Sequence, residues 1–320
     1  MKRRQFIKGS AIVGASLAAP LFFRANSGMY EAKGNRKVHQ ILNSDRTKVG
    51  TLPILRAFAG NHMDYVSPYV LLDEFGPVDL NAGADPLRVD AHPHAGVTPT
   101  TYFLEGSGHH KDSLNYDFQI GKGEFMMFSS GRGAIHMEET GQMLYDEGGI
   151  YHGFQIWLNM PAAHKFVDPT TSVFDTKSMD EVKHKDYHIK VILGDIFEAK
   201  SKVSTLSPAF YYHVNMSENA RLDIPTNPQH NAFVYIIKGA LELEGRKAAV
   251  ANQIVLFERG DSLINLYSQN GAEFLVLGGE PLNETVFSYG PFVMNNQEQI
   301  VQCIQNYRAG RMGDPTIVNQ

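Results

Sequence analysis

Short runs of β-branched and aromatic residues constrain the fold of this chain more than any other feature of its 320 residues. Each run is bounded by Gly, Asn, Asp or Pro, which is the pattern of strands separated by turns. The clearest runs are residues 100–104, 124–128, 154–158, 187–193, 232–237 and 273–277. Many short strands with little helical periodicity predict an all-β protein built of barrels or sandwiches.

One of these runs returns in the second half of the chain. The sequence TYFLEG at 101–106 is matched by VYIIKG at 234–239, and each copy is followed by a turn and another apolar strand. The same succession of elements predicts two copies of one barrel. The irregular stretch 159–185, which contains two prolines, is the predicted boundary. We therefore expect an N-terminal lobe over 28–165 and a C-terminal lobe over 166–320.

The chain is expected to end in a short helix. Asn296 and Glu298 form a helix start, and Ile300 and Ile304 lie on one face of the pattern that follows. Gly310 stands where a residue with a left-handed backbone usually ends a helix.

Residues 1–27 have the composition of an export signal. A basic start with paired Arg3 and Arg4, then Phe6 and Lys8, precedes a mildly apolar run rich in Gly and Ala. This order resembles a twin-arginine signal, although Lys2 stands where Ser or Thr is usual. An ordinary secretory signal is the alternative. The prediction is an exported, periplasmic protein, anchored if the signal stays uncleaved.

Charge and cysteine content narrow the classes of partner. Residues 1–27 hold five of the 29 Lys+Arg and no acidic residue, so the remaining 24 basic side chains face 34 Asp+Glu, a net charge of −10. An acidic chain is a poor nucleic-acid binder. Cys303 is the only cysteine in the sequence and allows no internal disulfide. No apolar stretch is long enough to predict a membrane span.

Two short histidine patterns indicate a metal site. His92 and His94 precede the first repeated strand, and His136 and Glu138 follow a glycine turn. In an extended chain residues i and i+2 project from the same face, so each pair can direct two ligands at one ion. Such pairs are also common by chance, and surface histidines remain the alternative on these residues alone.

Longer motifs around these residues, in order and spacing, resemble the signature of the pirin family. The resemblance extends from about residue 36 to residue 312. The motifs are HPHAG at 92–96, TYFLEG at 101–106, HKDS at 110–113, GRGAIHME at 131–138, GIYHGFQIW at 149–157, GGEPLNE at 278–284 and YGPFVMN at 289–295.

This resemblance implies a bicupin, that is, two double-stranded β-helix (jelly-roll) barrels with a metal in the N-terminal lobe. The implied ligands are His92, His94, His136 and Glu138. The implied cofactor is one divalent ion, with Fe(II) favoured and Mn, Ni, Co, Cu or Zn left open by mixed N/O ligation. The C-terminal lobe is expected to hold no metal.

Two positions depart from the usual pirin pattern. Thr98 stands where pirins commonly carry Glu, and Ala95 stands where a basic residue often follows the histidine pair. Both changes weaken inferences about the substrate. Outside the ligand set, His109 and His110 are expected in solvated or cross-strand roles, His152 as scaffold, and Trp157 in the core.

The resemblance implies a dioxygenase that acts with O₂ on quercetin-like flavonols or on related enols or phenols, with Glu138 serving as ligand and general base. The alternative is a non-catalytic, exported pirin that senses metal or redox state or binds a partner. The identity of any protein partner is left open.

Overall fold

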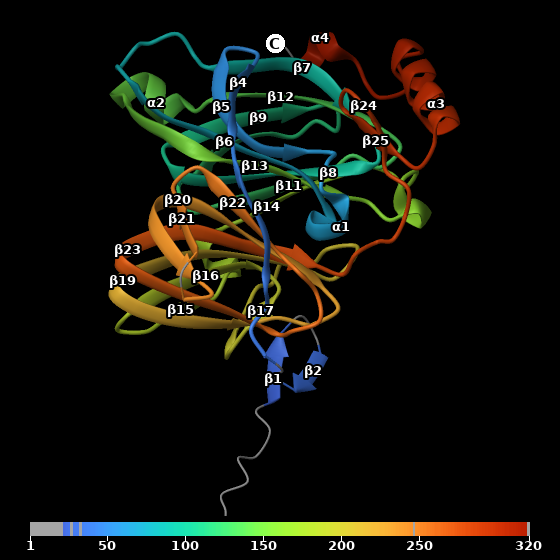
Figure 1. The fold of residues 1–320 in the computed structure, drawn as a ribbon. Helices are drawn as coiled ribbons and strands as arrows, with labels where there is room; N and C mark the ends of the chain where they lie inside the picture. The colour runs from blue at the N-terminus through green and yellow to red at the C-terminus, as the bar shows by residue number, and fades with distance from the viewer. Residues whose placement is uncertain (1–21, 26–27, 32–33, 246, 319–320) are drawn as a thin grey trace, which may run out of the picture.

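Two β-lobes stacked one above the other make up the computed structural model, which describes residues 22–25, 28–31, 34–245 and 247–318 (Figure 1). The predicted all-β bicupin with a C-terminal helix is confirmed. Apart from 22–25, the predicted export signal lies outside the described residues. Among the helices described, none is long and apolar enough to cross a membrane.

The N-terminal lobe contains a seven-stranded and a four-stranded antiparallel sheet. The larger sheet has the order β14-β11-β8-β13-β6-β5-β4 and the smaller the order β10-β9-β12-β7. Their strands are β4 (Asp45–Val49), β5 (Leu52–Ala59), β6 (Tyr69–Leu80), β7 (Arg88–His94), β8 (Val97–Glu105), β9 (Ser107–Asp112), β10 (Asp117–Gly121), β11 (Phe125–Ser129), β12 (Ala134–Thr140), β13 (Gly149–Asn159) and β14 (Thr170–Phe174).

The C-terminal lobe is one eight-stranded sheet of order β15-β16-β19-β23-β20-β22-β3, with β21 paired to β20. These strands are β3 (Val38–Asn43), β15 (Glu181–Lys183), β16 (Tyr187–Leu193), β19 (Ala209–Pro225), β20 (Asn231–Leu243), β21 (Lys247–Val250), β22 (Gln253–Phe257) and β23 (Leu263–Gly279). Three small pairs complete the strands: β1 (Phe22–Ala25) with β2 (Gly28–Glu31), β17 (Asp195–Ile196) with β18 (Ala199–Lys200), and β24 (Phe287–Tyr289) with β25 (Phe292–Met294).

Helices are few and short in the described part of the chain. They are α1 (Met63–Val66), α2 (Gln142–Glu147), α3 (Gln297–Arg308) and α4 (Pro315–Val318), with 3₁₀ turns η1 (Ala162–His164) and η2 (Thr176–Ser178). Helix α3 begins as predicted, because the Asn296 side chain accepts a hydrogen bond from the Gln299 amide. It also ends as predicted, with Gly310 at a φ of 68°.

The repeat seen in the sequence is a repeat of strand pairing. In the first lobe Tyr102 of β8 pairs with Phe125 of β11, and in the second Tyr235 of β20 pairs with Ile254 of β22. Each lobe also contains a strand from the other half of the chain. Strand β3 pairs with β22 in the C-terminal lobe, and β14 pairs with β11 in the N-terminal lobe. The exact division at 165/166 stays a prediction.

The lobes are joined by an apolar interface. Along β20, Val234 belongs to the core of the C-terminal lobe, whereas Phe233 and Tyr235 belong to a second core shared with Phe154 and Tyr69 of the N-terminal lobe. Both faces of β20 are therefore buried. A strand buried on both faces needs apolar residues at consecutive positions, which explains the uninterrupted run 232–237.

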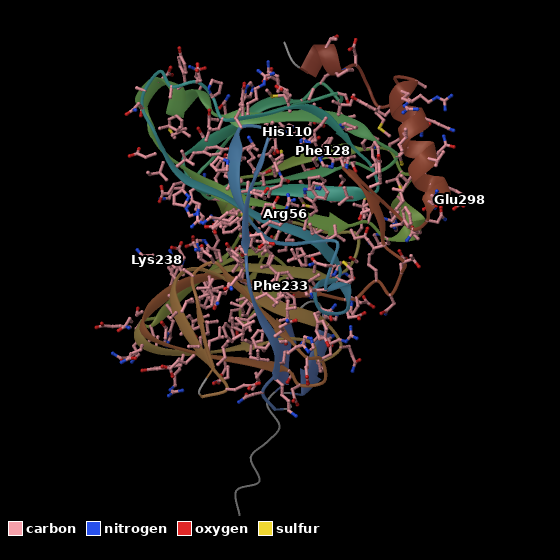
Figure 2. All side chains as sticks on the ribbon, turned by 45° about the horizontal axis from the view of Figure 1, so that its top comes forward. Arg56, His110, Phe128, Phe233, Lys238 and Glu298 are labelled. Carbon is pink, nitrogen blue, oxygen red and sulfur yellow. The ribbon has the colours of Figure 1, made fainter. Side chains whose placement is uncertain are left out.

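The C-terminal segment returns to the N-terminal lobe (Figure 1). Phe292 of β25 forms a parallel bridge with Ala95. Ile300 and Cys303 of α3 are buried in a cluster that includes Met137 of β12. Glu298 lies on the outward side of α3 (Figure 2). Strand β25 and helix α3 are thus packed beside the strands that carry the predicted metal ligands.

Candidate metal centre

The two predicted histidine positions meet because β7 and β12 run antiparallel at one edge of the four-stranded sheet. His136 lies directly opposite His92 in the strand register. Residues two apart share a face of a strand, so His94 projects toward the same side as His92. A ring nitrogen of each histidine lies within 4.8 Å of the others. Pro93 is tolerated between the two because β7 is an edge strand.

Backbone carbonyl groups orient two of the three rings. His92 Nδ1 donates to the Asp90 carbonyl oxygen at 2.8 Å, and His94 Nδ1 donates to the Pro291 carbonyl oxygen at 3.2 Å. A carbonyl only accepts, so in both rings the proton is on Nδ1 and the lone pair is on Nε2.

Burial keeps these rings neutral. Desolvation lowers the pKa of His94 and His136 well below the ordinary value, and the neighbouring His92 lowers both further. Burial also lowers the pKa of His92. Because neutral imidazole is the form that binds metal, this donor set fits one divalent cation.

Glu138 lies beside the three histidines in an overlapping group. Its carboxylate, one nitrogen of His136 and one of His110 are mutually within 4.8 Å. Oε1 accepts a hydrogen bond from Thr101 Oγ1 at 2.9 Å, and Oε2 accepts one from Gln155 Nε2 at 2.8 Å. The β12–β7 register shifts between His136 and Glu138, and such an irregularity re-aims a side chain. Glu138 as fourth ligand therefore stays a prediction.

A cavity of about 400 Å³ opens onto this group. His92, His94, His136 and Glu138 line it. Most of the remaining wall is apolar and comes from both sheets of the lobe: Val49, Leu52, Ile54, Phe75, Leu87, Val89, Phe103, Ile120, Tyr151 and Trp157. The polar part of the wall includes the Arg56–Asp73 ion pair, with Nη2 and Oδ2 2.6 Å apart, and also His109, His110, Glu139, Thr101, Gln155 and Ser288. The site can therefore take a largely apolar small molecule.

The two positions that depart from the usual pattern are not part of the cavity wall. Thr98 is buried and shares a hydrogen bond of 3.1 Å with Ser129. Ala95 is fully buried beneath the C-terminal segment, where it contacts Phe292. A long basic side chain at position 95 would collide with that segment, which gives a packing reason for alanine.

Comparison with known proteins agrees with the geometry. Residues 51–158 match the family model for pirin, and residues 211–313 match the model for the pirin C-terminal cupin domain. A pirin-like protein of Arabidopsis thaliana is 31% identical over 261 residues, covering 78% of this chain and 81% of the relative. The chain belongs to the pirin family. The two family models fall on the two lobes.

Other pirin relatives carry names that refer to an activity. A Pseudomonas aeruginosa protein named as a candidate quercetin 2,3-dioxygenase is 29% identical and covers 84% of this chain and 95% of its own length. The crystal structure of a quercetin 2,3-dioxygenase from Acinetobacter baumannii has a TM-score of 0.85 at 25% identity, covering 88% of this chain and all of that one. These similarities agree with one metal ion and a small-molecule substrate.

His110, the histidine of the pirin motif HKDS, has one of the two roles expected for it. His110 has no exposed surface and lies inside the N-terminal lobe beside Phe128, so the expected solvated role is wrong (Figure 2). The cross-strand alternative is confirmed, because the His110 ring stacks on Phe118 of the neighbouring strand β10. The available signal was the i, i+2 spacing of His110 and Asp112, whose side chains share a buried face.

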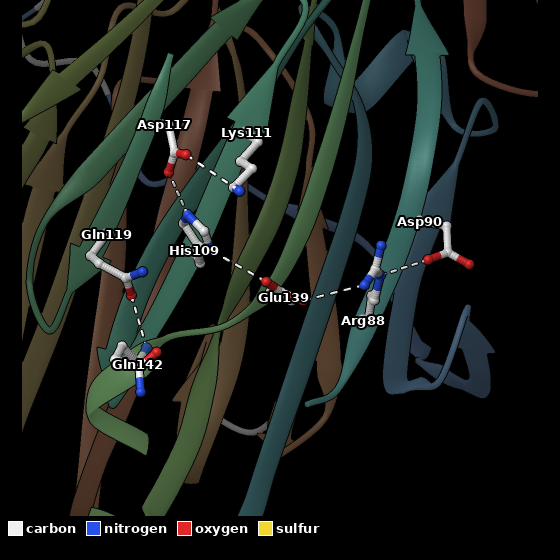
Figure 3. A network of polar contacts seen from close by, with 8 residues as sticks. All are labelled: Arg88, Asp90, His109, Lys111, Asp117, Gln119, Glu139 and Gln142. Atoms are coloured by element: carbon white, nitrogen blue, oxygen red, sulfur yellow. Dashed lines mark hydrogen bonds and ion pairs between the residues drawn. The ribbon is translucent and has the colours of Figure 1, made fainter. Parts of the chain in front are cut away.

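The neighbouring His109 also has the expected cross-strand role. Figure 3 shows it bound to Asp117 of β10 and Glu139 of β12, and Glu139 in turn approaches Arg88 of β7. These polar contacts cross all four strands of the smaller sheet.

The expectations for His152 and Trp157 had different outcomes. His152 is structural, since its Nε2 lies 2.6 Å from Glu74 Oε1 near the lobe interface. Trp157 is not simply core, because it lines the cavity and its ring meets His94 edge-on with centroids 4.8 Å apart. Thr101, Gln155 and Pro291 were missed altogether, because their partners are distant in the sequence.

Proposed function

We propose that this pirin binds one divalent metal ion through His92, His94, His136 and Glu138, and oxidises a quercetin-like flavonol or a related enol or phenol with O₂. The observation that carries the proposal is the convergence of three neutral imidazoles on an apolar cavity of about 400 Å³. Cavities of about 300–1,000 Å³ suit small organic ligands. Relatives named for quercetin 2,3-dioxygenase support this substrate class.

Fe(II) is the metal we propose. Imidazole and carboxylate without thiolate suit Fe(II), and they also suit Mn, Ni, Co, Cu and Zn. When bound, the ion supplies an electrophilic centre at which the deprotonated substrate hydroxyl and O₂ can react.

The protein groups have separate proposed tasks. Glu138 accepts the proton of the substrate hydroxyl. Thr101 and Gln155 each donate to one of its oxygens, which fixes the plane of the carboxylate. The apolar walls, including Phe75 and Phe103, hold the flat rings of the substrate and exclude water from the reacting atoms.

We also propose export to the periplasm by the twin-arginine route through residues 1–27. The support is the Arg3–Arg4 pair and the weak apolar run that follows it. Export of a folded chain would allow metal loading before translocation. Cell fractionation of a chain with Lys in place of both arginines tests this directly.

The test of the function combines metal analysis with oxygen uptake on addition of quercetin. We expect one ion per full-length chain, and uptake that disappears in His92→Ala because the variant loses a ligand. His230→Ala is the control, since His230 is also buried but lies in the C-terminal lobe. It should keep both the ion and the uptake.

Two results would count against the proposal. Wild-type protein with a full complement of ion and no uptake with several flavonols, enols and phenols would favour the non-catalytic alternative. Unchanged metal content in His92→Ala would contradict the ligand assignment itself.

A further inference from the structure

His136 differs from its two partners in having an unpaired ring nitrogen. His92 and His94 each donate Nδ1–H to a carbonyl group. His136 Nδ1 is buried and, in the part of the chain that the structure describes, has no hydrogen-bond partner. Metal-binding histidines almost always donate their second nitrogen to an acceptor, and buried polar atoms are seldom left unpaired. We therefore expect a hydrogen-bond acceptor for this nitrogen among the neighbouring side chains.

The protonation of His136 follows from its contact with His92. The two Nε2 atoms are 3.0 Å apart. His92 carries its proton on Nδ1, so its Nε2 can only accept, and His136 must donate Nε2–H. In that tautomer His136 Nδ1 is a lone pair. To offer the Nε2 lone pair to a cation, His136 must carry its proton on Nδ1 instead.

His110 is held in the one tautomer that can receive that proton in a hydrogen bond. Its Nε2 lies 3.0 Å from Asp112 Oδ2. The Asp112 carboxylate also accepts from Thr171 Oγ1 at 2.5 Å and from the backbone amides of Leu114 and Tyr116 at 2.9 and 3.1 Å. A carboxylate that only accepts places the His110 proton on Nε2. His110 Nδ1 is then a lone pair, and it too is buried and unpartnered among the described residues.

The two unpaired nitrogens belong to neighbouring rings. The centroids of His110 and His136 are 5.3 Å apart, and a nitrogen of each lies within 4.8 Å of the other. Aromatic rings hold both in place: Phe128 stacks on His136 at 4.6 Å, and Phe118 stacks on His110 at 5.1 Å. While both Nδ1 atoms are lone pairs, no hydrogen bond can join them.

We propose that His110 is the positioning residue for His136. When a cation binds to the three Nε2 atoms, the His136 proton moves from Nε2 to Nδ1. His136 Nδ1–H then donates a hydrogen bond to His110 Nδ1, directly or through one water. Asp112, His110 and His136 then form a relay that fixes the third ligand, as Asp90 and Pro291 fix the other two. The inference rests on the proposed metal centre, but the tautomer of His110 is independent of any metal.

Histidine ¹⁵N NMR on the full chain reads both parts of the proposal. Without metal we expect His110 as Nε2–H with a bare Nδ1, and His136 as Nε2–H. With Zn²⁺, a diamagnetic probe, we expect His136 to become Nδ1–H while His110 is unchanged. His110 found as Nδ1–H without metal, or His136 bound to Zn²⁺ through Nδ1, overturns the proposal.

Zn²⁺ affinity, measured by competition with a chromophoric chelator, tests the same relay. His110→Phe keeps the ring contacts with Phe118 and Phe128 and removes the acceptor. We expect affinity to fall by roughly 10- to 100-fold, the usual effect of removing a ligand's partner. His230→Phe is the matched control, because His230 Nδ1 is also buried and unpartnered among the described residues but lies in the other lobe. It should bind Zn²⁺ as wild type does.

Asp112→Asn is the second variant, which keeps the proposal testable if His110→Phe does not fold. The Asn amide oxygen can still accept the hydrogen bonds from the Leu114 and Tyr116 amides, while its NH₂ group donates to His110 Nε2. Because Nε2 must then be an acceptor, the His110 proton moves to Nδ1. The expected readouts are that tautomer change and a similar loss of affinity. A folded His110→Phe or Asp112→Asn protein with unchanged affinity contradicts the inference, whereas wild type that binds no Zn²⁺ contradicts the proposed centre instead.

Discussion

The carboxylate of Glu138 is held by two neutral donors on strands of the opposite sheet. Thr101 is on β8 and Gln155 is on β13, and their hydrogen bonds of 2.9 and 2.8 Å go to different oxygens. A carboxylate held at both oxygens has one orientation relative to the histidines. Whether Glu138 acts as ligand, as base or as both, its position depends on these donors.

Removing one donor should therefore affect turnover more than folding. Thr101→Val keeps the side-chain shape and removes the hydroxyl, so we expect quercetin-dependent oxygen uptake to fall roughly tenfold or more. Thr100→Val is the matched control, since the Thr100 hydroxyl donates to the Ile156 carbonyl oxygen rather than to Glu138. Equal uptake in the two variants, measured at equal metal content, would show that the Thr101 contact has no role in turnover.

At the scale of elements, the β24–β25 hairpin links the end of the chain to a site in the first lobe. Val286, Ser288, Gly290, Pro291 and Val293 line the cavity. The Pro291 carbonyl also accepts from His94 Nδ1. The hairpin thus forms part of the cavity wall and orients His94, one of the proposed ligands.

Backbone strain in the turn of the β24–β25 hairpin should weaken metal binding at the proposed site. Gly290 has a φ of 56°, and a Cβ added there would meet no atom within 4 Å, so Gly290→Val introduces backbone strain with room for its Cβ. A side chain in the left-handed region costs about 1–2 kcal/mol, and relief of that strain would move Pro291 away from His94. We expect weaker Zn²⁺ binding, measured by chelator competition. Gly245→Val, at a φ of 71° in a turn of the other lobe, should destabilise the protein similarly and leave Zn²⁺ affinity intact.

At the scale of the whole molecule, polar links cross the largely apolar interface between the lobes. The Tyr102 hydroxyl of the N-terminal lobe donates to His213 Nδ1 at 3.1 Å, and His213 Nε2 donates to Glu273 at 2.9 Å. A second link joins Tyr235 to Glu74 at 2.5 Å. Tyr102 follows Thr101 on β8, so one strand carries a contact to the interface and a contact to the site.

The first link should make stability depend on pH. The hydrogen bond from His213 lowers the pKa of Glu273 from its ordinary value of 4.5, although burial opposes it. A group whose pKa is lower in the folded state stabilises the protein above its unfolded-state pKa and loses that contribution as the pH falls. Glu273→Gln should therefore lower the free energy of unfolding by roughly 1 kcal/mol at pH 6.5, with a smaller difference below pH 4.5.

Urea unfolding at pH 6.5 and pH 3.5 measures this difference. Glu218→Gln is the control, because Glu218 is exposed on β19. The same loss for Glu273→Gln at both pH values would exclude the ionised link as the cause.

The sequence by itself determined the elements and their repetition. Short runs of β-branched and aromatic residues, glycine turns and the match between 101–106 and 234–239 depend only on neighbouring residues, so the strands and the two lobes were predictable. The pairing of His92 with His94 was predictable for the same reason, because the geometry of one strand places them on one face. A helix start at Asn296 and an end at Gly310 are equally local.

Only the tertiary structure decided what surrounds the proposed ligands. The acceptor for His94 Nδ1 is the Pro291 carbonyl group, and the donors to Glu138 come from two strands of the other sheet. His110 is buried, and the sequence of β9 alone does not show which face of that strand is buried. Each contact joins segments whose separation depends on strand order and register, and these arise from the packing of the whole lobe. Short-range patterns do not contain information about that packing, which is why the proposed ligands could be predicted from the sequence and most of the groups that contact them could not.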